Sequence, residues 1–382
     1  MTAPEASIPR DPLMPAIAAH ERAIALRAAT RLPEAEAACR RALAVYAKVE
    51  GPRHPDVANA LVELGQILEA RDRPRPARRC HARALAILQA HVRRAPVDAR
   101  DPDVARLRVR ARVFLANIDR GLGTYAAADR GFRAALAQAR RVFGPRDPDV
   151  GSILNNLGVL RKAQGRYAEA TRFYRRALPL MRATRDREAV ATLYHNLGGI
   201  EHARGRYAAG EPYARKSVAL REAALGRDHV AVAADVAALA AIVEGRGRLA
   251  EAARLYERAL RVFRRKLGPD STEVALNLSS LAALRQQQGR AAEAGRLYAR
   301  ALPLQERLYG RGHPEVAMTL HNFAYHERAR GRLARARALY ARALRIFRRA
   351  LGPRHPHARL CASNLRAVEA ERNVRHADAR KP

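Results

Sequence analysis

The sequence contains no tryptophan and only three cysteines, and aromatic residues make up 5% of its 382 positions. Cys39, Cys80 and Cys361 are too few and too scattered for a disulfide framework or a zinc site. We therefore expect three small core thiols in a reducing compartment, which predicts a cytoplasmic protein without a metal or other cofactor.

Long apolar runs are also missing. The most apolar window, residues 231–243, is interrupted by Asp235 and is shorter than a bilayer requires. The first residues carry three prolines before Pro15 and lack the basic-then-apolar pattern of a secretion signal. The sequence therefore predicts neither a membrane span nor a secretion signal.

Positive charge is abundant, with 72 Lys and Arg residues against 37 Asp and Glu, a formal charge of +35. Lysine supplies only five of the 72, so the excess is arginine. Two explanations of the arginine excess stay open. It can reflect codon bias in a GC-rich genome, or it can form a surface that binds anions. Hydrophobic residues make up 48% of the chain, which excludes a disordered protein, and the prevalence of Ala, Leu and Arg favours helices.

A linker of about seven residues recurs along the chain and is typified by residues 144–150. From Val232 the matching positions follow at intervals of 42 residues, at Val274, Val316 and Ala358. In each copy, glycine is suited to end one helix, and Asp, Ser or His is suited to cap the next. A fixed period of this length predicts a solenoid of stacked units.

Each unit has a second break near its middle, as at residues 165–167. Leu157 and Gly158 precede this break, and Ala170 and Tyr174 follow it at helical spacing. Each unit is therefore predicted to be a helix–turn–helix hairpin. We expect Gly158 and Ala170 to let its two helices approach closely, and each such tyrosine to fill the gap between hairpins.

This series of Leu-Gly, Gly-x-Tyr, Ala and Tyr-x-x-Ala-Leu resembles the tetratricopeptide repeat, in the 42-residue form of kinesin light chains and their prokaryotic relatives. The resemblance implies an all-α solenoid, a right-handed superhelix of helix–turn–helix repeats. The Trp and closing Pro of the family pattern are absent, and no heptad coiled coil precedes the repeats.

We expect eight hairpins and a C-terminal capping helix within a solenoid over residues 13–373, between disordered tails at 1–12 and 374–382. The first hairpin spans 13–50, and the cap runs from Pro356 to about Asn373. The other hairpins open near Pro55, Pro102, Pro148, Arg187, His229, Ser271 and Pro314.

The resemblance implies that an extended peptide or a partner helix binds in a concave groove lined by the first helix of each hairpin. The position before each Leu-Gly or Leu-Ala pair then faces this groove. Asparagine there can clamp a peptide backbone because its amide both donates and accepts. A bond to a neighbouring helix or to water explains such residues equally well. The candidates are Asn156, Asn196, Ser280, Asn322 and Asn364, with Ala238 at the remaining repeat.

A second row lies six residues further along each first helix and is mostly basic. It forms either a groove wall that favours an acidic ligand or an ordinary solvated face. Its members are Lys162, His202, Glu244, Gln286 and Arg328.

Arginine also recurs before each Ala-Leu pair and after each mid-repeat glycine, which predicts two basic stripes attractive to acidic proteins, phosphates or anionic lipid. Non-specific binding of nucleic acid through these stripes is the main alternative function. The repeat tyrosines belong to the core pattern, however, and no nucleic-acid reading motif accompanies the repeats.

No metal-binding, phosphate-binding or nucleophile motif occurs in the sequence, so we do not expect an enzyme. We expect a scaffold that binds an extended or helical segment of an acidic partner protein in its groove. Backbone clamping is assigned to the asparagines, and charge recognition to Lys162 and Arg328.

Overall fold

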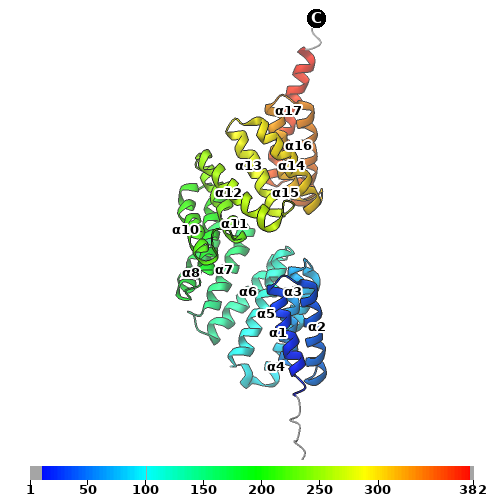
Figure 1. Ribbon diagram of the computed structural model, residues 1–382, viewed down its shortest axis with the longest axis vertical. Coiled ribbons are helices and arrows are strands. Elements are labelled where there is room, and N and C mark those ends of the chain that lie inside the picture. Colours follow the sequence, from blue (N-terminus) through cyan, green and yellow to red (C-terminus); the bar gives the residue numbers. More distant parts are fainter. Residues whose placement is uncertain (1–10, 100, 379–382) are drawn as a thin grey trace, which may run out of the picture. The chain divides into compact units, whose positions relative to one another are not determined.

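The computed structural model describes residues 11–99 and 101–378, which form seventeen α-helices, one short 3-10 helix and no strand (Figure 1). The chain divides into two compact units with the boundary between Arg185 and Asp186, which we call unit 1 and unit 2. The predicted solenoid of residues 13–373 therefore spans two units. Residues 1–10 and 379–382, which belong to the predicted tails, lie outside the described residues.

Unit 1 contains four helical hairpins. Their helices are α1 (Met14–Ala28), α2 (Leu32–Val49), α3 (Pro55–Ala70), α4 (Pro74–Arg94), α5 (Pro102–Gly121), α6 (Tyr125–Val142), α7 (Pro148–Ala163) and α8 (Tyr167–Ala183), with the 3-10 helix η1 (Pro96–Ala99) after α4.

Unit 2 contains four further hairpins and one additional helix. Its helices are α9 (Arg187–Ala203), α10 (Tyr207–Leu225), α11 (Val230–Gly245), α12 (Leu249–Leu267), α13 (Thr272–Gln287), α14 (Ala291–Tyr309), α15 (Pro314–Ala329), α16 (Leu333–Leu351) and α17 (Pro356–Asp378). The hairpins after the first one open near the predicted positions, from Pro55 to Pro314. Helix α17 extends beyond the predicted limit at Asn373, so the predicted C-terminal tail begins inside a helix.

The linkers end and begin helices as their residues predict. Gly144 after α6 adopts a left-handed φ of 91°, and the Asp147 carboxylate accepts a hydrogen bond of 2.8 Å from the amide of Asp149 at the start of α7. Histidine also serves as a cap, since Nδ1 of His313 accepts from the amide of Glu315 at 3.2 Å. Between α8 and α9, where the linker has no glycine, Arg185 takes the left-handed conformation with a φ of 59°.

The first helices line the inner side of each unit. Successive first helices contact one another, α1–α3, α3–α5 and α5–α7 in unit 1 and α9–α11, α11–α13 and α13–α15 in unit 2. Within the described residues, no successive pair of second helices makes contact of this extent. The first helices therefore form the concave face of each unit. No helix of the described chain is long and apolar enough to cross a bilayer.

The two helices of a hairpin can approach closely where one of them carries glycine, which has no side chain. The ring of Tyr174 on α8 is fully buried and lies against Gly158 on α7, where a Cβ atom would stand 2.3 Å from the ring carbon Cε1. This tyrosine thus packs inside its own hairpin, in contrast to the expected place between hairpins. Tyr298 does reach the next hairpin, because its ring stacks on Phe323 with centroids 5.2 Å apart.

We predict that Gly158→Ala lowers the free energy of unfolding by about 1–3 kcal/mol, because the added methyl group displaces the Tyr174 ring. Gly121→Ala is the control: Gly121 is also helical and in unit 1, but its added Cβ meets open space. Urea unfolding followed by circular dichroism measures both variants. Equal unfolding midpoints for the two variants would show that the close approach is unimportant.

Candidate functional site

The predicted row of amide and hydroxyl side chains lies on first helices in both units and on the additional helix α17. Asn156 is on α7 in unit 1, and the others occupy α9, α13, α15 and α17 in unit 2. All five side chains are half-buried. The members in unit 2 are Asn196, Ser280, Asn322 and Asn364.

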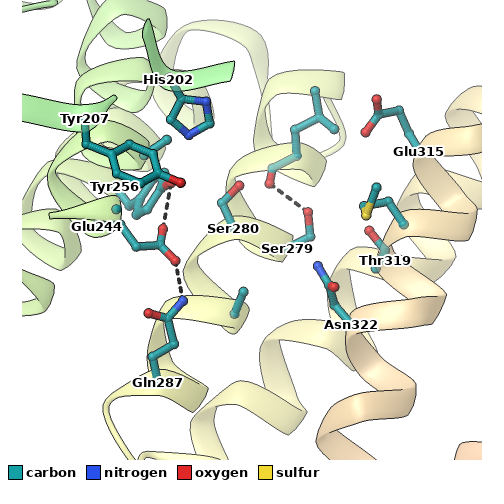
Figure 2. A pocket seen from close by; sticks show the side chains of 15 residues that line it. His202, Tyr207, Glu244, Tyr256, Ser279, Ser280, Gln287, Glu315, Thr319 and Asn322 are labelled. Atoms are coloured by element: carbon teal, nitrogen blue, oxygen red, sulfur yellow. Dashed lines mark hydrogen bonds between the residues drawn. The ribbon is translucent and has the colours of Figure 1, made fainter. Parts of the chain in front are cut away.

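A cavity of about 430 Å³ opens on the first helices of unit 2 (Figure 2). It brings together four residues of the predicted rows, namely His202 from α9, Glu244 from α11, Ser280 from α13 and Asn322 from α15. Gln286 is not among the lining residues, and its neighbour Gln287 takes that place. Sequence reasoning did not identify the other polar lining residues, which include Tyr207, Tyr256, Ser279, Glu315 and Thr319.

Other predicted residues have partners within the protein. The Asn364 amide nitrogen lies 3.4 Å from Nε2 of His321, which links α17 to α15. Arg328 forms an ion pair with Glu371 of α17, and its Nε lies 3.1 Å from each carboxylate oxygen. The Arg328 charge, assigned from the sequence to an acidic ligand, is therefore matched inside unit 2. Lys162 lies in unit 1, and burial lowers its pKa.

Glu244 on α11 joins three helices at the cavity. Its Oε1 accepts a hydrogen bond of 2.6 Å from Nε2 of Gln287 on α13, and its Oε2 accepts one of 3.1 Å from the hydroxyl of Tyr256 on α12. Burial raises the pKa of Glu244, and the two hydrogen bonds act in the opposite direction. The sequence placed Glu244 on the groove wall, but it gave no sign of either partner.

Tyr207 forms an aromatic wall of the cavity. Its ring lies against Gly245, where a Cβ atom would come within 2.5 Å of the ring, and the ring centroid of His202 is 5.5 Å away. Leu249 and Ala291 occupy the same repeat position in the next two hairpins. The sequence analysis used tyrosine at this position only as part of the Gly-x-Tyr pattern at the mid-repeat break and did not assign Tyr207 to the site.

The model of the family described as "Tetratricopeptide repeat" matches residues 15–90, 107–183, 189–265, 233–307, 271–348 and 315–381. The chain belongs to the tetratricopeptide repeat family. The predicted all-α solenoid of such repeats is confirmed by this match and by the helices described above. No curated protein sequence matches the chain.

Solved structures with the same fold include the apo form of the quorum sensor NprR from B. thuringiensis, with a TM-score of 0.66, 15% identity and coverage of 88% of each chain. A Rap protein complexed with Competence and Sporulation Factor matches with a TM-score of 0.58 and 10% identity, over 93% of this chain and 98% of that one. The tetratricopeptide-like repeats of a putative kinesin light chain from Podosopora anserina match at 20% identity and a TM-score of 0.46, over 53% of this chain and 96% of that one.

Many of the recurrent arginines of these tetratricopeptide repeats bind carboxylates on neighbouring elements. Glu211 on α10 is buried and is bound by Arg215 on the same helix and by Arg246 and Arg248 after α11. Burial opposes ionisation of Glu211, but the hydrogen bonds from the three arginines outweigh it and lower its pKa to about 2. Arginine therefore links successive hairpins, a role that the sequence analysis did not consider beside codon bias and anion attraction.

We predict that Glu211→Gln destabilises the protein at pH 7 by about 1–3 kcal/mol, less than for a fully buried pair because the arginines are partly exposed. The folded pKa of about 2 lies below the ordinary value of 4.5, so the ionised Glu211 stabilises the fold above pH 4.5 and loses this effect as the pH falls toward 2. Urea unfolding at pH 7 and pH 3 should show the wild-type advantage shrinking.

The matched control is Glu188→Gln, at an exposed residue of α9 without an ion pair among the described residues. Because this variant removes only a first-turn charge at the start of α9, it should change the stability by less than about 1 kcal/mol at either pH. A Glu211→Gln variant as stable as the wild type at pH 7 would contradict the structural role of the three arginines.

Proposed function

We propose that the protein is a non-catalytic interaction scaffold that binds an extended or helical segment of a partner protein on the concave face of unit 2. The observation that carries this proposal is the cavity on the first helices, in which polar side chains from successive repeats face the same space. Rap, a protein of similar fold, was solved in a complex with Competence and Sporulation Factor, which supports a binding role for this architecture.

Asn322 and Ser280 supply the polar groups that would hold a peptide backbone. The half-buried Asn322 amide forms no hydrogen bond with another residue of the described chain, so its donor and acceptor groups remain available. Ser280 occupies the same repeat position 42 residues earlier, on the neighbouring first helix. Amide and hydroxyl groups in this arrangement can pair with backbone groups regardless of the side chains of the bound segment.

The partner is proposed to be acidic overall, because a net charge of +35 attracts anionic proteins over a long range. Non-specific nucleic-acid binding is the second candidate. It is favoured by Arg264 and Arg300, which form no ion pair with a carboxylate among the described residues. Burial lowers the pKa of Arg264, and the nearby charge of Arg300 acts in the same direction.

We place this activity in the cytoplasm. All three cysteines are free thiols, with Cys39 and Cys361 buried and Cys80 half-buried. Burial raises the pKa of each thiol, for Cys361 to about 11. Thiols protected from ionisation in this way are unreactive and suit a reducing compartment.

A pull-down with the full chain, with and without nuclease treatment, tests the proposal. We predict a defined protein partner that survives nuclease, with capture reduced about tenfold or more in a Ser280→Ala/Asn322→Ala variant, because two hydrogen-bonding side chains are lost. Quantitative mass spectrometry of the captured proteins gives the readout.

The matched control is Ser152→Ala/Asn156→Ala on α7 of unit 1, which removes the same two side-chain types. Unchanged capture by this control supports the placement in unit 2, and loss of capture only in this control would overturn it. Loss of every captured protein after nuclease treatment would favour nucleic acid as the ligand.

A further inference from the structure

The cavity on unit 2 has a charge opposite to that of the chain. Basic residues outnumber acidic ones 72 to 37 in the sequence, yet no arginine or lysine lines the cavity. Its carboxylates are Glu244 on α11 and Glu315 on α15, which Figure 2 shows on opposite sides of the space. The remaining titratable lining groups are His202, Tyr207 and Tyr256. A ligand that enters this cavity therefore meets two carboxyl groups and no lysine or arginine.

Glu244 differs from the other carboxylates that are withdrawn from solvent. Its hydrogen-bond donors, Gln287 and Tyr256, are both neutral. By contrast, the buried Glu211, Glu36 and Glu327 each bind at least two arginines. Two carboxylate oxygens can accept about four hydrogen bonds in all. Glu244 is thus a half-buried acid with acceptor capacity left and no cation beside it among the described residues.

The second carboxylate is equally unmatched. Glu315 is exposed in the first turn of α15 and forms no ion pair within the described chain. Its backbone amide donates to the capping His313, which fixes the start of the helix and hence the position of this residue. Each carboxylate attracts a cation that enters the cavity, because neither has a counter-ion within the described chain.

The shape and the walls of the cavity fit a long cationic side chain. Ala241 and Ala283 leave space on α11 and α13, and Leu276 and Met318 offer apolar surface for an aliphatic stem. Tyr207 adds an aromatic wall that can attract a cation. A volume of about 430 Å³ lies within the range of pockets that hold small ligands.

We propose that this cavity receives one lysine or arginine side chain of the bound segment, with its charged end between Glu244 and Glu315. The inference rests on the proposed function and adds which type of residue the bound segment places in the cavity. The partner is then acidic as a whole but carries a basic residue at the position that enters the cavity.

Random linear peptides are selected on the full wild-type chain alone, and their affinities for that chain and for a Glu244→Gln/Glu315→Gln variant provide the test. The selected peptides should share a Lys or Arg. Replacing it by Met or citrulline should weaken binding to the wild type at least about tenfold, measured by calorimetry. The double variant should bind the original peptides equally weakly, and it should be insensitive to the replacement.

Two further variants distinguish charge from damage to the fold. Glu188→Gln removes the same type of charge from α9 outside the cavity and should bind like the wild type. Glu244→Asp retains the charge and should recover part of the affinity that Glu244→Gln loses. Thermal unfolding of every variant, compared with the wild type, checks that the fold is intact.

Peptides that lose affinity in Ser280→Ala/Asn322→Ala but not in Glu244→Gln/Glu315→Gln would overturn the inference and leave the proposed function standing. Selected peptides without a common basic residue would do the same. Failure of the wild-type chain to enrich any peptide over an empty surface would instead overturn the proposed function, and the inference with it.

Discussion

A two-helix hairpin cannot bury its apolar face alone, and stacking against neighbouring hairpins is the interaction on which the rest of the structure depends. Stacking requires small residues where helices of neighbouring hairpins approach, as at Gly245 of α11 against the ring of Tyr207 of α10. Because the stacked hairpins are alike, their linkers and helix caps recur at a nearly constant interval in the sequence. Because the first helices lie on the inner side of each unit, side chains at one repeat position lie on the concave face of their own unit.

The fold could be predicted where a local residue determines it. Asp147, Ser271 and His313 cap the helices that follow them, so those boundaries were readable from the sequence. The end of α17 was not, because no glycine follows Asn373 to end the helix. The division into two units at Arg185 was also missed, although the repeat shortens to 40 residues there and the linker lacks glycine.

The candidate site was predictable only from the repeat positions, which identified His202, Glu244, Ser280 and Asn322 as residues of one face. The contacts that decide the roles of its neighbours join residues 43 apart in the sequence: Glu244 with Gln287, Arg328 with Glu371, and His321 with Asn364. Such pairs depend on the stagger between successive first helices, which no local pattern specifies. The pairing of Arg328 with Glu371, and the absence of lysine and arginine from the cavity, were therefore visible only in the structure.

Hydrogen exchange of the full chain, with and without a selected peptide or captured partner, tests most directly that the inner face of unit 2 is the binding surface. The account predicts slowed exchange in residues 234–245, 276–287 and 318–329 of α11, α13 and α15, with little change in α12 and α14. Slowed exchange confined to the second helices, or to unit 1, would contradict it.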